Sequence, residues 1–206
     1  MKLLYFSLKG GVGKSSIALN HALENHYSYV TNDITSNMDR TLIRSFHQIP
    51  HNMKRIPQDM LALEDVVFDF GAMSSVIDSK VTHAVKHCDC VIIPTLTDAR
   101  SLKATIETYL LIHGEAKSII IIINNYQQTS KYEFAHDKLT NALGKVTILD
   151  IRSTTLFERV ARDGIKWFNN IGHARGEYQL LTTKNIHKDV YETINKIAKK
   201  GIKWNK

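Results

Sequence analysis

Apolar and polar positions along this chain form short apolar runs that alternate with amphipathic segments. The apolar runs have the length of β-strands and lie at residues 2–8, 27–33, 65–71, 90–95, 118–126 and 145–151. Helical patterns lie at residues 15–25, 101–114 and 132–143. Near-continuous apolar strands that alternate with helices are typical of a parallel sheet covered on both faces. The pattern therefore predicts an α/β protein with a mostly parallel, twisted sheet.

Polar residues stand where several of the predicted strands end. They are the segment 9–16, Asp33, Asp69 and Asn124. In open parallel sheets ligands bind at the carboxyl ends of the strands, so we expect these residues to gather at one edge of the sheet. Residues 37–64 combine a short helix with irregular chain. No repeat or linker divides the sequence, which predicts a single domain over residues 1–206.

A glycine-rich segment, SLKGGVGKSS, lies between the first predicted strand and the first predicted helix. A phosphate-binding loop requires this context, because glycines let successive N–H groups point inward and the helix adds its positive end. Lys14 is expected to reach the β- and γ-phosphates, and the Ser15 hydroxyl to ligate Mg²⁺. The residues expected to contact the nucleotide here are Gly10, Gly11, Val12, Gly13, Lys14, Ser15 and Ser16.

The apolar strand VVFD ends in Asp69, and Gly71 follows two residues later. A carboxylate in this place is suited to hold Mg²⁺ through a water molecule. The N–H group of Gly71 is suited to contact a γ-phosphate and to move when that phosphate leaves. Together with the glycine loop, these residues predict a site for ATP and Mg²⁺.

Composition adds little to this hypothesis but excludes some classes. The chain has 206 residues, of which 43% are hydrophobic and 23% charged. No apolar run approaches the roughly 20 residues that span a bilayer, and no signal-peptide pattern is present, so we expect a cytoplasmic protein. Cys88 and Cys90 are either half of a metal site or two small residues that enter a buried strand. The absence of a second cysteine pair favours the buried strand.

The net charge is +7, and its distribution is uneven. Residues 184–206 contain seven lysines against two acidic residues, and Ile186, Val190, Ile194 and Ile197 form a helical stripe. The tail is therefore either a solvated helix face, a surface for non-specific DNA or a membrane anchor. The candidate DNA-binding residues are Lys188, Lys196, Lys199, Lys200 and Lys203, which Arg152, Arg159, Arg162 and Lys166 would extend.

The loop KGGVGKSS resembles the deviant Walker A motif of the ParA/MinD family of P-loop ATPases, and weaker similarities continue to about residue 172. This resemblance implies a single-domain P-loop NTPase that hydrolyses ATP. It also implies roles for three residues. Lys9 would reach across a dimer interface to the nucleotide of the other subunit, Asp33 would position the attacking water, and Asn124 would contact the edge of the adenine.

Within that family, Leu8 and the start of the loop at residue 9 resemble the small ParA proteins of plasmids, which lack an N-terminal helix-turn-helix domain. This resemblance implies an ATP-dependent homodimer that binds DNA non-specifically on the nucleoid. It also implies a centromere-binding, ParB-like adaptor that stimulates hydrolysis. The alternative is a MinD-like switch that binds a membrane surface through the basic tail.

Overall fold

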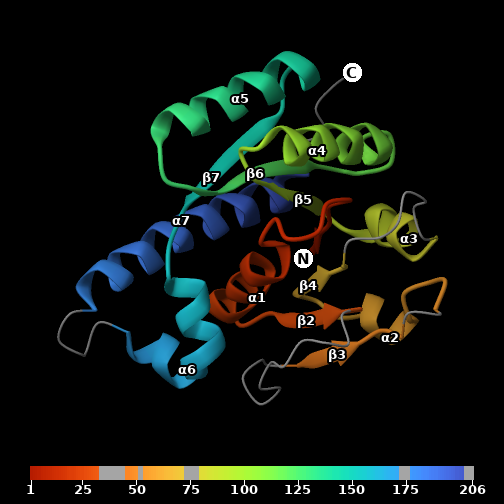
Figure 1. Ribbon diagram of the computed structural model, residues 1–206. Coiled ribbons are helices and arrows are strands. Elements are labelled where there is room, and N and C mark those ends of the chain that lie inside the picture. The colour runs from red at the N-terminus through yellow and green to blue at the C-terminus, as the bar shows by residue number, and fades with distance from the viewer. Residues whose placement is uncertain (33–44, 51–52, 72–78, 172–176, 202–206) are drawn as a thin grey trace.

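The computed structural model describes residues 1–32, 45–50, 53–71, 79–171 and 177–201 (Figure 1). Its strands are β1 (Lys2–Tyr5), β2 (Ser28–Thr31), β3 (Phe46–Gln48), β4 (Val66–Asp69), β5 (Cys90–Thr95), β6 (Ile119–Tyr126) and β7 (Thr147–Arg152). Its helices are α1 (Lys14–Asn25), α2 (Gln58–Leu61), α3 (Ser79–His87), α4 (Ala99–Ile112), α5 (Thr129–Leu143), α6 (Leu156–Asn170) and α7 (Tyr178–Lys200).

The strands form one sheet in the order β3-β2-β4-β1-β5-β6-β7, and every pair of neighbours is parallel. Alternate residues of each strand point to opposite faces. In β1, Leu3 and Tyr5 pack with α1 and α7, whereas Leu4 packs with α3, α4 and α5 on the other face. Burial on both faces explains why the strands are apolar at nearly every position. The predicted parallel α/β fold is confirmed.

The carboxyl ends of the central strands lie level with one another. Asp69 at the end of β4 pairs in register with Tyr5 of β1 on one side and with Thr31 of β2 on the other. The chain leaves β1 through the glycine loop directly above this row. The register therefore brings the loop, Asp69 and the residues after β2 to a common edge, as the sequence predicted.

Three elements were not expected from the sequence. The edge strand β3 lies within the segment interpreted as short helix and irregular chain, and α3 and α6 were not predicted as helices. The strand β3 has only three residues, all half-buried, so it carries no apolar run that would mark it. The helix α5 also begins three residues earlier than its predicted start at Tyr132.

The predicted apolar stripe of the C-terminal helix is partly wrong. Ile186 is 57% exposed, and the buried face of α7 consists of His187, Tyr191, Ile194, Asn195 and Ala198. Polar contacts with α1 explain this face. The His21 ring stacks on Tyr191 with ring centroids 4.6 Å apart, and its Nε2 lies 3.0 Å from Oδ1 of Asn195. A buried hydrogen-bonded network thus sets the rotation of α7, which apolar spacing alone does not reveal.

Candidate nucleotide-binding site

The glycine loop owes its shape to two residues with positive φ. Gly11 has φ 75° and Gly13 has φ 82°, a region that other residues rarely adopt. Gly13 is also the N-cap of α1, so no cap side chain occupies the first N–H groups of that helix, and its first turn has no acidic residue. These N–H groups and the helix dipole are therefore available to an anion.

Asn124 holds the loop from below. Its Nδ2 donates to the Val12 carbonyl over 3.0 Å, and a Cβ atom added to Gly13 would lie only 2.2 Å from the same Nδ2. Only glycine fits between α1 and this amide. The side chain of Asn124 is buried, whereas Asn125 beside it is exposed with φ 57°. The structure thus shows a role for Asn124 in supporting the loop, and its contact with adenine stays a prediction.

Lys14 bridges the two residues predicted to hold the metal. Its Nζ lies 2.9 Å from Oδ1 of Asp69 and 3.4 Å from Oγ of Ser15. Lys14 and Asp69 are both buried, so their ion pair is shielded from water. The ammonium group is a cation seated between a carboxylate and a hydroxyl. The same two oxygens suit Mg²⁺, a hard cation that is commonly bound through one carboxylate and through phosphate oxygens.

The residues present therefore fit Mg²⁺ and a nucleoside triphosphate. When bound, Mg²⁺ would supply charge neutralisation at the phosphate oxygens. Ser15 and Asp69 would hold it, and Lys14 would turn from Asp69 toward the phosphates. The open N–H groups at the start of α1 would donate hydrogen bonds to the oxygens of a phosphate that lies over the loop.

Gly71 has a partner that the sequence did not indicate. Its N–H donates over 2.7 Å to Oδ1 of Asn32, a buried residue directly after β2. This bond ties the end of β2 to the end of β4 at the residue predicted to meet a γ-phosphate. Nothing in the local sequence signals this contact, because the two residues are 39 positions apart.

Lys9 lies half-exposed at the rim of the loop, and its Nζ donates to the neighbouring Gly10 carbonyl over 3.3 Å. Asp98, after β5, faces the same rim. Its pKa is lowered first by the hydrogen bond from the Ser101 hydroxyl and then by backbone N–H groups, with a contribution from the charge of Lys9. The structure leaves Lys9 accessible to a second molecule. Gly10, Gly11 and Ser16 are exposed as well.

Two predicted residues, Asp33 and Lys203, lie outside the described residues. The water-positioning role assigned to Asp33 therefore stays a prediction. The preceding residue, Asn32, lies beside Gly71 at the end of β4.

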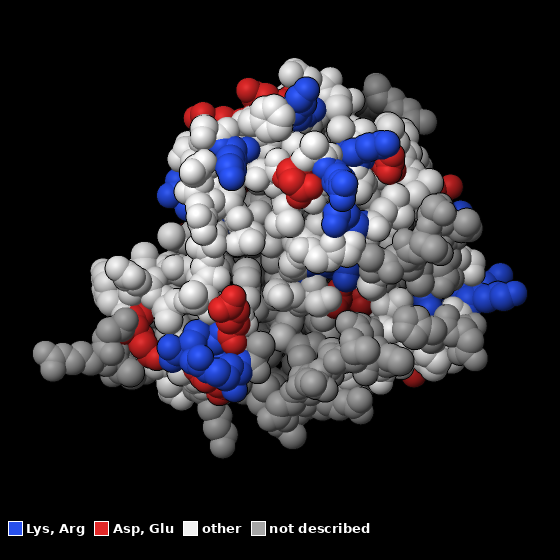
Figure 2. All heavy atoms as spheres, viewed as in Figure 1, with Lys and Arg blue, Asp and Glu red and all other residues white. Residues whose placement is uncertain are grey.

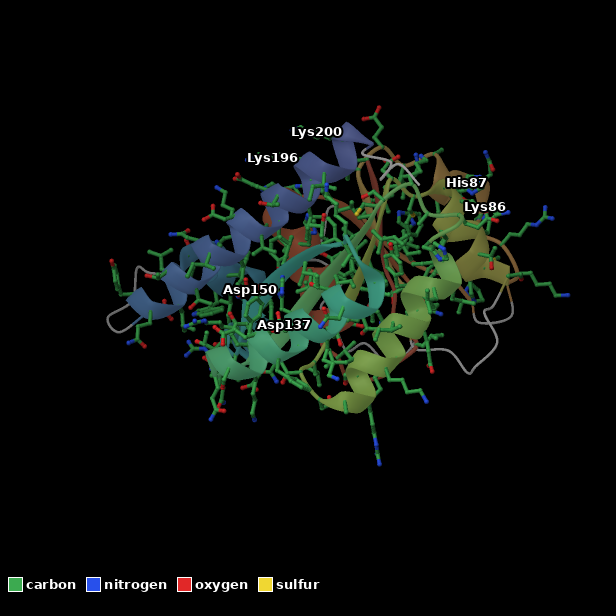
Figure 3. All side chains as sticks on the ribbon, turned by 90° about the horizontal axis from the view of Figure 1, so that it is seen from above. Lys86, His87, Asp137, Asp150, Lys196 and Lys200 are labelled. Carbon is green, nitrogen blue, oxygen red and sulfur yellow. The ribbon has the colours of Figure 1, made fainter. Side chains whose placement is uncertain are left out.

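The candidate DNA-binding lysines of α7 are exposed. Lys188, Lys196, Lys199 and Lys200 all reach solvent, and Lys196 has only a long contact of 3.9 Å with Glu192. Figure 3 shows Lys196 and Lys200 on the outer side of α7, across the sheet from α4 and α5. None of the helices among the described residues combines the length and the hydrophobicity that a membrane span requires.

The arginines of α6 do not extend this surface freely. Arg159 and Arg162 each lie 2.7 Å from Asp163, and Arg159 also reaches Glu177 over 3.3 Å. Their charges lower the pKa of Asp163 to about 2, with the Arg162 hydrogen bond as the largest cause. Figure 2 shows the basic and acidic atoms of this region mixed side by side over α6. Their positive charge is largely compensated locally.

The two cysteines are fully buried, as the interpretation of a buried strand predicted. Burial raises the pKa of the Cys90 thiol to about 12, so it stays protonated. Among the described residues no cluster of three or more histidine, cysteine or acidic side chains is arranged to hold a metal ion.

No family model and no curated protein matches the sequence. Solved structures do match the fold. The cell division ATPase MinD from Pyrococcus furiosus aligns with 92% of this chain and 98% of its own, at TM-score 0.62 and 13% identity. A ParA family ATPase from Chlorobium tepidum aligns with 90% of this chain and 96% of its own, at TM-score 0.59 and 15% identity. This chain has the ParA/MinD fold.

A third structure with the ParA/MinD fold is a protein from Borrelia burgdorferi named for plasmid partition and bound to AMPPNP. It aligns with 98% of this chain and 98% of its own, at TM-score 0.60 and 17% identity. All three alignments include most of the described sheet, so the overall architecture and not one motif carries the likeness. Identities this low establish the ParA/MinD fold, and activity has to be argued from the site itself.

Proposed function

We propose that this protein is an ATPase of ParA type that dimerises when it binds ATP and Mg²⁺, binds DNA without sequence preference and serves the partition of a plasmid or another DNA. Hydrolysis to ADP and phosphate would reopen the dimer, and a ParB-like adaptor would stimulate it. The observation that carries the proposal is the cation position between Asp69 and Ser15, which Lys14 fills beneath a loop shaped for phosphates.

The chemistry asked of the protein is mainly positioning and charge neutralisation. Lys14 and the first turn of α1 neutralise the phosphate oxygens. Ser15 and, through a water molecule, Asp69 would hold the metal, and Asn124 keeps the loop in its bent shape by donating to the Val12 carbonyl. Asp33 is assigned to orient the attacking water. Lys14, Ser15, Asp69 and Asn124 lie at the start of a helix or near the end of a strand, so the sheet holds these four residues in fixed positions.

Lys9 supports the proposed dimer. Its ammonium lies at the rim of the loop and contacts only a neighbouring carbonyl in the described structure, so it is free to meet the nucleotide of a second molecule. Moving a population from mostly monomer to mostly dimer requires about 5.5 kcal/mol of differential binding. Several hydrogen bonds to charged phosphate oxygens, at about 1.5–3 kcal/mol each, are enough to supply this free energy.

Exposed lysines along α7 support binding to a polyanion. They lie on the outer side of a helix whose inner side is packed on α1, so binding does not require the core to open. The described structure has no motif that reads bases, which suits contacts to phosphates alone. The dimer would present two copies of this surface and so bind DNA more tightly than a monomer.

A MinD-like switch on a membrane surface is the second candidate, and the likeness to MinD from Pyrococcus furiosus favours it equally at the level of the fold. The same lysines would attract anionic lipids. In the first candidate the ATP-bound protein binds DNA, and in the second it binds a membrane surface.

Co-sedimentation with DNA and with anionic liposomes, each with and without ATP and Mg²⁺, separates the candidates. We expect pelleting with DNA only when ATP is present. A variant with Lys199→Glu and Lys200→Glu should lose it, whereas Lys103→Glu, an exposed lysine on α4 across the sheet, should not. Pelleting with liposomes alone would support the membrane switch. Failure of ATP to change either interaction would contradict both candidates.

A further inference from the structure

The carboxylate of Asp69 receives one hydrogen bond on each oxygen. Lys14 Nζ lies 2.9 Å from Oδ1, and the Tyr29 hydroxyl donates to Oδ2 over 2.7 Å. Asp69 is only 1% exposed, so water does not compete for these oxygens. Oδ1 of Asp69 thus faces Lys14 and the phosphate loop, and Oδ2 faces Tyr29 of the neighbouring strand β2.

Tyr29 is held rigidly. It is fully buried in the middle of β2, where it pairs in register with Val67 of β4. Its ring stacks on Phe46 of β3 with centroids 6.1 Å apart and an interplanar angle of 24°. A fully buried ring that stacks on a neighbouring ring has few rotamers available, so its hydroxyl has a defined position against Asp69.

We propose that Tyr29 is a positioning residue for the metal site: it anchors Oδ2 of Asp69 so that Oδ1 stays turned toward the cation position. This inference rests on the proposed binding of ATP and Mg²⁺. When a nucleotide draws Lys14 toward its phosphates, Asp69 loses its cationic partner. The Tyr29 bond would remain, and it would keep the buried carboxylate oriented and hydrogen-bonded, with Oδ1 turned to the place where Ser15 and Asp69 would hold Mg²⁺.

Removing the hydroxyl has two consequences. Oδ2 becomes a buried acceptor without this donor, which disfavours the orientation seen here. The ion pair with Lys14 then becomes the main stabilising contact of the carboxylate, and this ion pair competes with the metal for Asp69. Both effects weaken the response to Mg²⁺ while leaving the loop and the start of α1 intact.

The test uses Tyr29→Phe, which keeps the ring against Phe46. A fluorescent ATP analogue is titrated in excess chelator and at increasing Mg²⁺, and the Mg²⁺ concentration that gives half of the gain in affinity is read. We expect this concentration to rise about tenfold, equivalent to about 1.4 kcal/mol, with the affinity in chelator changed less than twofold. Tyr27→Phe, a half-buried tyrosine two residues earlier, is the matched control and should shift neither value.

A double-mutant cycle supplies a second measurement. In an Asp69→Asn background the Tyr29→Phe change should no longer affect the response to Mg²⁺, and urea unfolding should show that the two changes are not additive in stability. Equal Mg²⁺ midpoints for Tyr29→Phe and Tyr27→Phe, or full additivity in the cycle, would overturn the positioning role. If the nucleotide affinity of the natural protein does not change with Mg²⁺, the proposed function is refuted instead.

Discussion

Replacing Gly13 with alanine places a methyl group against the side chain that supports the phosphate loop. The added Cβ would lie 2.2 Å from Nδ2 of Asn124, so that amide must move and release the Val12 carbonyl. The alanine must also adopt φ 82°. Gly11→Ala is the matched control, because Gly11 has φ 75° but nothing within 4 Å of its added Cβ.

The two substitutions separate backbone strain from crowding. Left-handed strain costs an alanine about 1–2 kcal/mol, and the stiffer unfolded chain returns about 0.4–1 kcal/mol. Gly11→Ala should therefore lower the free energy of unfolding by about 1 kcal/mol. Gly13→Ala should lower it by about 2–4 kcal/mol, since a buried polar group left without its partner adds about 1–3 kcal/mol.

Urea unfolding without nucleotide measures both variants, and a third protein tests the cause. In an Asn124→Ala background the crowding is gone, so Gly13→Ala should cost about as little as Gly11→Ala. If Gly11→Ala and Gly13→Ala prove equally destabilising, or if Asn124→Ala leaves the cost of Gly13→Ala unchanged, the close packing of Asn124 beneath the loop is refuted.

Two further predictions concern acid stability and nucleotide choice. Burial lowers the pKa of His21 to about 3 and that of His187 to about 4, from 6.5. The unfolded chain therefore takes up these protons first, and the free energy of unfolding should fall by about 1.6 kcal/mol per histidine between pH 6.5 and pH 5. Urea unfolding at pH 6.5 and at pH 5 should show that His187→Leu loses about half as much free energy of unfolding as the natural protein loses. An equal loss in the two proteins would contradict the lowered pKa of His187. Asn32→Leu frees the N–H of Gly71 to bind the γ-phosphate. Competition binding should therefore show the affinity ratio of ATP to ADP rising about fivefold, the equivalent of one hydrogen bond of about 1 kcal/mol. An unchanged ratio would show that the bond from Gly71 to Asn32 does not compete with the γ-phosphate.

Local sequence patterns predicted the elements that carry the phosphate site. The run that became β1, the glycines after it and the start of α1 lie together in the chain, so their order alone indicated a loop between strand and helix. Asp69 was found for the same reason, as a polar residue at the end of a buried apolar strand. These signals depend on neighbours in sequence, and the parallel sheet converts them into neighbours in space.

Contacts between distant positions were not predictable. Asn124 and Val12 are 112 residues apart, and Tyr29 and Asp69 are 40 apart, so nothing local marks either hydrogen bond. The buried face of α7 was misjudged for a related reason, because His21 on α1 selects it through polar contacts. In each case the folded sheet brings a buried polar group to a partner that is distant in the sequence.

In the proposed dimer, Lys9 of one molecule completes the nucleotide site of another. Sedimentation velocity of the natural protein and of Lys9→Ala, each with ATP and Mg²⁺ and without nucleotide, tests it most directly. We expect an ATP-dependent dimer for the natural protein, and a monomer for Lys9→Ala that still binds ATP. A normal ATP-dependent dimer formed by Lys9→Ala, or a natural protein that stays monomeric when loaded with ATP, would contradict it.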